Sequence, residues 1–190
     1  MISAPQTVTA AAFKTASRPG FRGTPVVGGT LSAIAGPWSP HPTLSYQWQQ
    51  DGEPIDGATE ETLVVPAACA GKEITLQVTA ERTGYVTRET ISDAVTISYG
   101  TIESSMPRIE GDPRVDETLH VIKGEWSAQT EFHYQWIVGG VARDGRSTGP
   151  AYKVRPEDRA QRVTVEVTGR RDGCEPVVRS SAATEPVRRA

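Results

Sequence analysis

The chain has 190 residues, of which 37% are hydrophobic and only 6% aromatic, and its formal net charge at pH 7 is −3. Such a low aromatic content disfavours a packed helical protein and suits thin β-sandwiches, whose strands are apolar on one face only. Lysine and arginine are interleaved with carboxylates and do not cluster, unlike the basic residues of a nucleic-acid-binding surface. We therefore expect an all-β fold and no nucleic-acid partner.

The first residues carry neither an export signal nor a membrane signal. No basic residue precedes the apolar stretch at the N-terminus, and Pro5, Gln6 and Thr7 interrupt that stretch, so no secretory signal peptide is visible. No apolar run in the chain approaches the roughly 18 residues of a membrane span. The sequence therefore predicts no membrane insertion.

Residues 1–20 form an N-terminal arm that contains two basic residues and no acidic ones. One interpretation is a disordered leader. The other is an arm that adds a strand to the sheet edge of a neighbouring protein, with its basic residues meeting an acidic surface. The candidate partner-binding residues of this arm are Val8, Phe13, Lys14 and Arg18.

The rest of the chain is one unit written twice. Residues 46–48 read Tyr-Gln-Trp, and the same three residues return 88 positions later at 134–136. The match at this spacing relates residues 25–52 to 113–140, and a spacing of 89 relates the segments that follow, so a one-residue insertion falls in a loop between 141 and 147. We therefore expect two domains after the arm, residues 21–100 and residues 101–190.

The apolar residues in each unit recur with the period of a β-strand. Residues 31–34 and 74–80 alternate in the first unit, and residues 119–122 and 163–168 alternate in the second. Asp51-Gly52 and Gly139-Gly140 supply hairpin turns at matching places. About seven short strands per unit with one tryptophan in a central strand predict two tandem immunoglobulin-like β-sandwiches.

The sequence also predicts which side chains fill the two cores. Trp48 and Trp136 are expected in the third strand of each sandwich, packing against the sixth. The two cysteines do not occupy corresponding positions, so no inter-sheet disulfide is expected and aliphatic side chains take that role. These further core residues are Leu31, Leu76 and Val78 in the first unit, and Leu119, Val165 and Val167 in the second.

Two further tryptophans, Trp38 and Trp126, stand at corresponding positions beside a glycine bend. Their repetition favours a plug over the end of each sandwich, and stacking on a sugar ring or on a partner surface is the alternative.

The first unit resembles a known bacterial repeat. The motifs that carry the resemblance are Val-Gly-Gly-Thr-Leu at 27–31, Tyr-Gln-Trp-Gln-Gln-Asp-Gly-Glu-Pro-Ile at 46–55, Gly-Ala-Thr at 57–59 and Gly-Tyr at 84–85. Residues 21–99 are thereby similar to the Ig-like repeat of actinobacterial surface proteins and of structural proteins of their tailed phages. The second unit departs from the pattern, with Gly139-Gly140 for the Asp-Gly and Cys174 for Tyr85. The resemblance implies display and adhesion roles and brings no catalytic residue.

No catalytic, cofactor or metal site is expected. The three histidines have no cysteine or carboxylate at ligand spacing, and nucleophile, phosphate-loop and dinucleotide motifs are absent from the sequence. The acidic clusters at 60–61 and 112–117 lack the spacing of a calcium loop and read as solvated loop charge. We therefore expect a protein that is not an enzyme.

The expected function is that of a structural or display protein in the virion of a tailed bacteriophage, as a capsid decoration or tail-associated protein. It would attach through its arm or one domain and project the other. Sixteen arginines against four lysines, with no asparagine, suggest a GC-rich genome. Expected partners are other capsid or tail proteins, with a host cell-surface glycan as a further candidate. The alternative is an extracellular or cell-surface bacterial adhesin, or a carbohydrate-binding accessory module.

Overall fold

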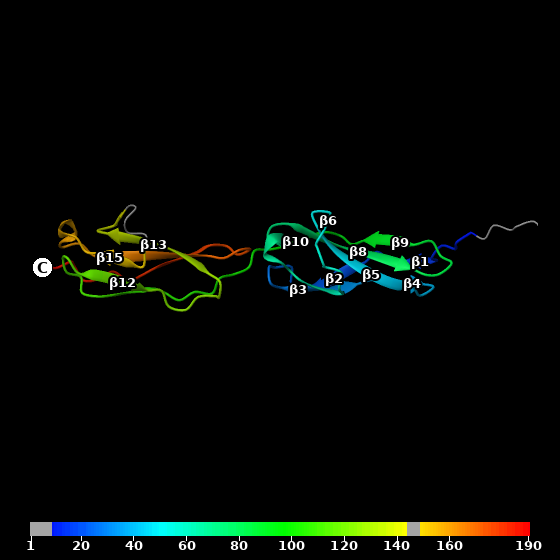
Figure 1. The fold of residues 1–190 in the computed structure, drawn as a ribbon, viewed down its shortest axis with the longest axis horizontal. Coiled ribbons are helices and arrows are strands. Elements are labelled where there is room, and N and C mark those ends of the chain that lie inside the picture. Colours follow the sequence, from blue (N-terminus) through cyan, green and yellow to red (C-terminus); the bar gives the residue numbers. More distant parts are fainter. Residues whose placement is uncertain (1–8, 144–148) are drawn as a thin grey trace, which may run out of the picture. The chain divides into compact units, whose positions relative to one another are not determined.

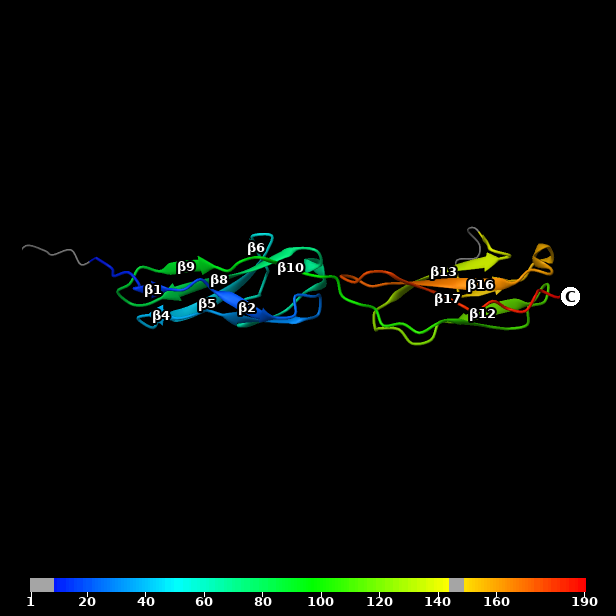
Figure 2. The ribbon, with the colours of Figure 1, turned by 180° about the vertical axis from the view of Figure 1, so that it is seen from behind.

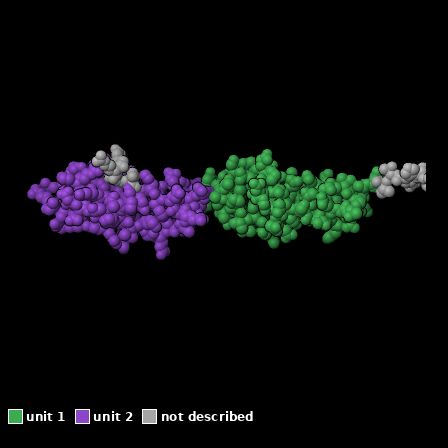
Figure 3. Space-filling model, in the orientation of Figure 1, with its two compact units in different colours: residues 1–100 green, residues 101–190 purple. Residues whose placement is uncertain are grey.

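The computed structural model describes residues 9–143 and 149–190. Contacts divide the chain after Gly100 into unit 1, Met1–Gly100, and unit 2, Thr101–Ala190 (Figure 3). Each unit has two principal β-sheets around its own cluster of buried apolar residues. The chain is therefore all-β, with two immunoglobulin-like sandwiches in tandem.

Unit 1 is built from strands β1 to β10 (Figure 1). Its smaller principal sheet has the order β2 (Gly20–Gly23), β3 (Thr30–Ile34), β7 (Thr62–Val64). Its larger sheet has the order β10 (Val95–Thr96), β8 (Glu73–Glu81), β5 (Thr43–Gln50), β6 (Glu53–Pro54), and β9 (Arg88–Ile91) also pairs with β8. The pair β1 (Thr15–Ala16) and β4 (Trp38–Ser39) lies apart from both sheets, and a 3-10 turn η1 (Ala67–Cys69) precedes β8.

Unit 2 repeats this plan with strands β11 to β17. One sheet has the order β11 (Arg108–Glu110), β12 (Thr118–Ile122), β15 (Ala151–Lys153). The other has the order β14 (Val141–Ala142), β13 (Glu131–Val138), β16 (Val163–Arg170), β17 (Val177–Ser180), and a 3-10 turn η2 (Pro156–Asp158) precedes β16. Figures 1 and 2 show the two layers of this unit, with β12 in one and β13 beside β16 in the other.

The alternating side chains place one face of each strand in the core. Along β8 and β16 every second residue is buried, as a strand with one buried face requires. Trp48 lies opposite Leu76, and Trp136 lies opposite Val165, as cross-strand neighbours within one sheet. All eight side chains expected in the cores are at most 1% exposed: Leu31, Trp48, Leu76, Val78, Leu119, Trp136, Val165 and Val167.

The tryptophan also contacts the opposite sheet in unit 1, because the ring of Phe21 in β2 lies 5.4 Å from the ring of Trp48. The polar edge of each indole needs a partner once it is buried. Trp48 donates its Nε1–H to the carbonyl of Glu60 at 3.0 Å, and Trp136 donates to Gly149 at 3.0 Å. The repeated Tyr-Gln-Trp motif thus marks the centre of each core.

The described part of the N-terminal arm differs from the sequence-based expectation, because it belongs to the fold of unit 1. Ala16 in β1 pairs with Trp38 in β4, and Ser104 pairs with Trp126 at the same place in unit 2. The repeat therefore starts before residue 20. Ser104 and Ser105, at the start of the second repeat, have the same role in unit 2. The first segments of the two units share few identical residues, because backbone groups make the pairing and most side chains there are free to differ.

A glycine in unit 2 gives a test of how tightly its core is packed. Gly169 lies in β16 at the position of the buried Ala80 in unit 1, and a Cβ at Gly169 would come 2.4 Å from Cζ3 of Trp126. We expect Gly169→Ala to destabilise unit 2 by about 1–3 kcal/mol through overpacking. Calorimetric unfolding of the full chain measures this loss, and Ala80→Gly in unit 1 is the reciprocal control. An unchanged transition for unit 2 would contradict the clash.

Candidate functional site

The duplication lets unit 1 serve as a reference for unit 2. Features that both units share hold the fold, whereas features found in one unit are candidates for function. Two features of unit 2 are candidates: a buried ionic network in place of apolar residues of unit 1, and a bulge in the final segment, residues 184–188, which lies beside a cavity.

The ionic network replaces an apolar cluster of unit 1. The backbone hydrogen bonds identify the corresponding positions, since Ile55 donates to Trp48 at 2.9 Å and Arg143 donates to Trp136 at 2.9 Å. Leu63, the cross-strand partner of Leu31, corresponds to Tyr152, the partner of Leu119. Cys69 and Asp158 correspond because they are the last residues of η1 and η2. The exchanges from unit 1 to unit 2 are Ile55 to Arg143, Leu63 to Tyr152 and Cys69 to Asp158.

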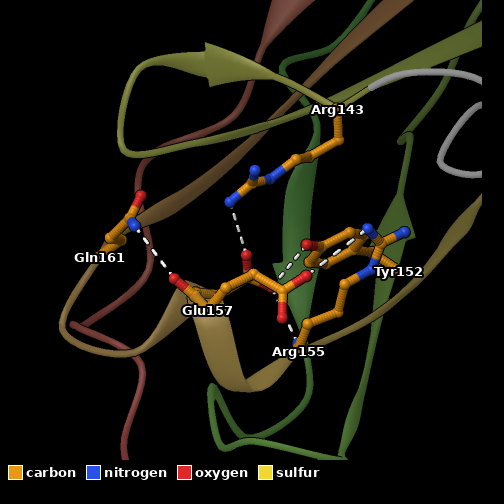
Figure 4. A network of polar contacts seen from close by, with 6 residues as sticks. Arg143, Tyr152, Arg155, Glu157 and Gln161 are labelled. Carbon is orange, nitrogen blue, oxygen red and sulfur yellow. Dashed lines mark hydrogen bonds and ion pairs between the residues drawn. The ribbon is translucent and has the colours of Figure 1, made fainter.

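Asp158 is the centre of this network and is fully buried. Its carboxylate accepts hydrogen bonds from the Tyr152 hydroxyl at 2.5 Å, from Nη2 of Arg143 at 2.7 Å and from the backbone N–H of Arg155 at 2.8 Å. Figure 4 shows these three residues converging, with Glu157 and Gln161 joined beside them. The Tyr152 ring also stacks on Trp136 at 5.5 Å. A buried charge that is paired and hydrogen-bonded in this way fixes the loop around η2 to the core.

The phenol of Tyr152 makes the stability of unit 2 dependent on alkaline pH. Burial, together with its hydrogen bond to Asp158, raises the pKa of Tyr152 from 10.0 to about 12. Because the folded state favours the protonated phenol, this stabilisation is complete below pH 10.0 and is lost as the pH rises through about 12. We expect the stability difference between the natural protein and Tyr152→Phe to shrink across this window in urea unfolding. A stability difference that stayed constant across this pH window would contradict the raised pKa of Tyr152.

The final segment of unit 2, which follows β17, contains a bulge. In unit 1, Val95 pairs with Ile74, and Ile97, two residues later, donates its N–H to Lys72. In unit 2 the equivalent backbone bonds start from Thr184 and Val187, which are three residues apart. One extra residue is therefore accommodated across Glu185 and Pro186, and Pro186 has no N–H to continue the ladder.

A cavity of about 620 Å³ opens beside this bulge. Its lining consists of Ile109, Gly111, Pro113, Thr184, Glu185, Pro186 and Arg188. The counterpart of Ile109 in unit 1 is the larger Phe21, which reaches Trp48. The extra residue of the bulge and the smaller side chain in β11 both fit an opening at this place.

The charged groups at the cavity form ion pairs. Arg188 pairs with Asp112, which also lies 3.6 Å from Nε of Arg114. Glu185 lies 3.8 Å from Arg162. The two charged residues of the lining, Glu185 and Arg188, are therefore of opposite sign, and both are held in ion pairs.

The candidate residues of the arm are not brought together at an open surface. Val8 lies outside the described residues. The Phe13 ring lies 5.6 Å from Trp38 and 5.3 Å from Tyr85, so it is part of an aromatic cluster within unit 1. Arg18 pairs with Asp93 at 2.7 Å. Lys14 uses its backbone N–H to bind Ser39 and is exposed.

The paired tryptophans Trp38 and Trp126 have intramolecular contacts as well. Trp38 is 6% exposed, and its Nε1–H binds Ala35. Trp126 binds Lys123 in the same manner, and its ring lies 5.3 Å from that of Phe132. These contacts fit an end plug for each sandwich.

Within residues 9–143 and 149–190, no three His, Cys, Asp or Glu side chains gather as metal ligands would. The same part of the chain has no helix with the length and apolar character needed to cross a membrane. Cys69 is buried and Cys174 is half-buried, and both are free thiols.

Comparison with solved structures finds similar tandem domains. The three N-terminal domains of the highly immunogenic outer capsid protein of bacteriophage RB49 match 90% of this chain and 59% of their own length, at 18% identity and a TM-score of 0.36. A Ca²⁺-stabilised adhesin with which an Antarctic bacterium binds ice matches 93% of the chain and 50% of its own, at 13% identity and a TM-score of 0.39. The tandem Ig repeats of Dlar match 90% of the chain and 98% of their own, at 16% identity and a TM-score of 0.28.

These similarities concern the fold alone. The chain spans about half to three fifths of the length of the phage and adhesin structures. No protein-family model matches the sequence, and no curated protein matches it.

Sequence reasoning missed both features that distinguish unit 2. Aligning the two units places Asp158 at the position of Cys69 and Tyr152 at the position of Leu63. This alignment contained a signal for the network, because two core positions that are apolar in unit 1 are polar in unit 2. The bulge had no comparable signal, since the final segments of the two units share too few residues to show a second insertion.

Proposed function

We propose that this chain is a non-enzymatic structural or display protein of a tailed-phage virion, either a capsid decoration or a tail-associated protein. It attaches through unit 2 and projects unit 1. The observation that carries this proposal is the contrast between the units: both keep one tryptophan-centred core, while unit 2 has a loop anchored by a buried ionic network where unit 1 has apolar residues, together with a cavity beside its final segment. A repeated scaffold with one modified copy suits a spacer with one attachment face.

The choice of unit 2 as the attached end has two supports. The ring of Phe13 packs within unit 1, which removes the aromatic residue of the described arm from binding, although Lys14 and Arg18 stay exposed. Residues 21–100 contain nine acidic and four basic residues, and this negative excess favours solvation of unit 1 away from the particle.

Purified particles from the source lysate provide the test. We expect mass spectrometry of gradient-purified virions to detect this chain, and particles grown without its gene to lack it. Added full-length protein should restore occupancy on those particles. Variants in the unit 2 cavity should reduce occupancy, whereas variants in exposed residues of unit 1 should not.

The competing function is that of a bacterial surface adhesin. Detection of the protein in the cell-wall or secreted fraction, together with its absence from purified virions, would reject the phage role and support the adhesin. Equal loss of occupancy after changes in either unit would reject attachment through unit 2 alone.

A further inference from the structure

We propose that residues 2–9 are the final strand of a further immunoglobulin-like sandwich, whose other strands lie outside this sequence. The partner is a sandwich that lacks its own last strand and takes up this one by strand addition. This inference concerns the N-terminal side of unit 1. It goes beyond the proposed function, because it holds for a virion protein and for a cell-surface protein alike. Residues 1–8 lie outside the described residues, so their sequence is matched to the described final segments of both units.

Residues 2–9 repeat the sequence pattern of the final segment of unit 1. They read Ile-Ser-Ala-Pro-Gln-Thr-Val-Thr, and residues 91–98 read Ile-Ser-Asp-Ala-Val-Thr-Ile-Ser. The first, second and sixth positions are identical, and the last two are conservative exchanges. The distance between these segments is 89 residues, which also relates the later segments of the two units. The pattern of a final strand thus occurs before unit 1 as well as at its end.

The serine of this pattern joins the final segment to the neighbouring strand in both described units. Ser92 is 4% exposed and Ser181 is 9% exposed. The Oγ of Ser92 accepts the N–H of Leu76 at 2.9 Å, and the Oγ of Ser181 accepts the N–H of Val165 at 3.1 Å. Each serine also donates its own N–H to the carbonyl of the same partner. These two bonds fix the position of the final segment, and Ser3 stands at the same place in its pattern.

An aliphatic residue closes the core near the end of the same segment. Ile97 is 1% exposed in unit 1, and its counterpart Val187 is 3% exposed in unit 2. Val8 follows Ser3 by five positions, as Ile97 follows Ser92. Both described sandwiches already contain this serine and this aliphatic residue, so neither leaves their place open for the arm. The segment therefore matches a sandwich other than units 1 and 2.

The least typical residue of the segment, Pro5, falls where the described strand is interrupted. β9 ends at Ile91 and β10 begins at Val95, and residues 92–94 between them belong to no strand. Pro5 corresponds to Ala94 in this interval. Proline cannot donate a ladder hydrogen bond and is tolerated in such breaks. Its presence is therefore compatible with a final strand.

The arm then joins unit 1 as the corresponding segment joins unit 2. Ala11 donates its N–H to Gly84 and accepts that of Val86, in the turn between β8 and β9. In unit 2, the carbonyl of Thr101 lies 3.9 Å from the Sγ of Cys174, in the turn between β16 and β17. Each unit is thus preceded by a segment that passes the same turn. Before unit 2 this segment continues directly from the final strand of a sandwich, and the same order predicts a final strand before Ala11.

The first experiment transfers the segment within the full chain. Five substitutions give residues 91–98 the sequence of residues 2–9: Asp93→Ala, Ala94→Pro, Val95→Gln, Ile97→Val and Ser98→Thr. We expect unit 1 to keep a cooperative unfolding transition, lowered by no more than about 15 °C, because Ser92 and an aliphatic residue at position 97 remain. The amide of Leu76 should keep its chemical shift, since its hydrogen bond to Ser92 is retained.

The control carries the same eight residues in reverse order, which includes Ser92→Val and Ile97→Ser. Its composition is the same, but it places an aliphatic residue at the buried serine and a polar one in the core. The transition of unit 1 should therefore be lost. Loss of that transition with the forward segment, or equal stability of the two orders, would overturn the proposal.

A second experiment examines the partner and does not depend on the folding of a variant. Amide hydrogen exchange of residues 2–9 is measured in the protein purified under native conditions from its source, with a synthetic peptide of residues 1–10 as the reference. We expect exchange in the native material to be slower by about a hundredfold or more, as in a hydrogen-bonded strand. Exchange at the rate of the free peptide would overturn the proposal.

The intact mass of the native material distinguishes the two sources of the partner sandwich. A polypeptide longer than these 190 residues, with an immunoglobulin-like repeat before residue 2, places the sandwich in the same polypeptide. A chain of 190 residues bound to another polypeptide with such a repeat places it in a separate protein, and Val8→Asp should then release that partner. Slow exchange with neither, or with a second copy of this chain as the only bound polypeptide, would overturn the proposal.

Discussion

Asp158→Ala should destabilise unit 2 by about 3 kcal/mol or more, because it leaves buried donors without their acceptor. Arg143 keeps only 24% of its side chain exposed, so its guanidinium cannot regain full hydration. The Tyr152 hydroxyl and the Arg155 N–H lose the same partner. Calorimetry of the full chain should show a lower transition temperature for unit 2, with the transition of unit 1 as the internal control.

Unit 1 supplies a matched rescue for this variant. The triple change Arg143→Ile, Tyr152→Leu and Asp158→Cys copies the apolar cluster of unit 1 into unit 2. Replacing a whole buried ionic group by packed apolar side chains is often neutral or stabilising. We expect the triple variant to recover most of the stability that Asp158→Ala loses. A triple variant as unstable as the single one would contradict the equivalence of the two clusters.

Trp48→Ala should destabilise unit 1 by about 3–5 kcal/mol, the usual cost of removing a large buried aromatic side chain. The change leaves a void beside Leu76 and Phe21. It also removes the hydrogen bond to the Glu60 carbonyl. Because a whole domain is stable by only about 5–15 kcal/mol, this loss should be visible as a large fall in the urea midpoint of unit 1.

The mirror variant Trp136→Ala provides the control, since it should affect unit 2 and spare unit 1. Trp48→Phe keeps an aromatic ring and should lose less stability than Trp48→Ala. If Trp48→Ala lowered both transitions equally, the tryptophan would not be confined to the core of its own unit.

The sequence predicted the sandwiches well because their evidence is periodic. Alternation along 74–80 and 163–168 records one buried face, and the repeated tryptophan records the centre of the core. The arm was harder to place because β1 has only two residues and pairs through its backbone. Side-chain patterns do not record such pairing.

The distinguishing features of unit 2 lay beyond single-sequence reasoning for a different reason. Asp158 and Arg143 are fifteen residues apart, and only the folded loop brings them within 2.7 Å. The bulge is defined by the carbonyl groups that accept hydrogen bonds from Thr184 and Val187. In the sequence, Glu185 and Pro186 between them are typical of an ordinary loop. Both features are properties of the backbone path, which the composition of a short segment does not determine.

In each unit, an early segment and the final segment pair in parallel, through Val26 with Ser98 and through Arg114 with Arg188. The backbone bonds of Val27 and Ser98, and of Val115 and Arg188, reinforce these bridges. When two parallel segments are pulled from opposite ends, their hydrogen bonds lie across the pulling direction and are loaded together, in shear. Tension that reaches these segments along the chain is therefore shared among several bonds and does not unzip them one at a time.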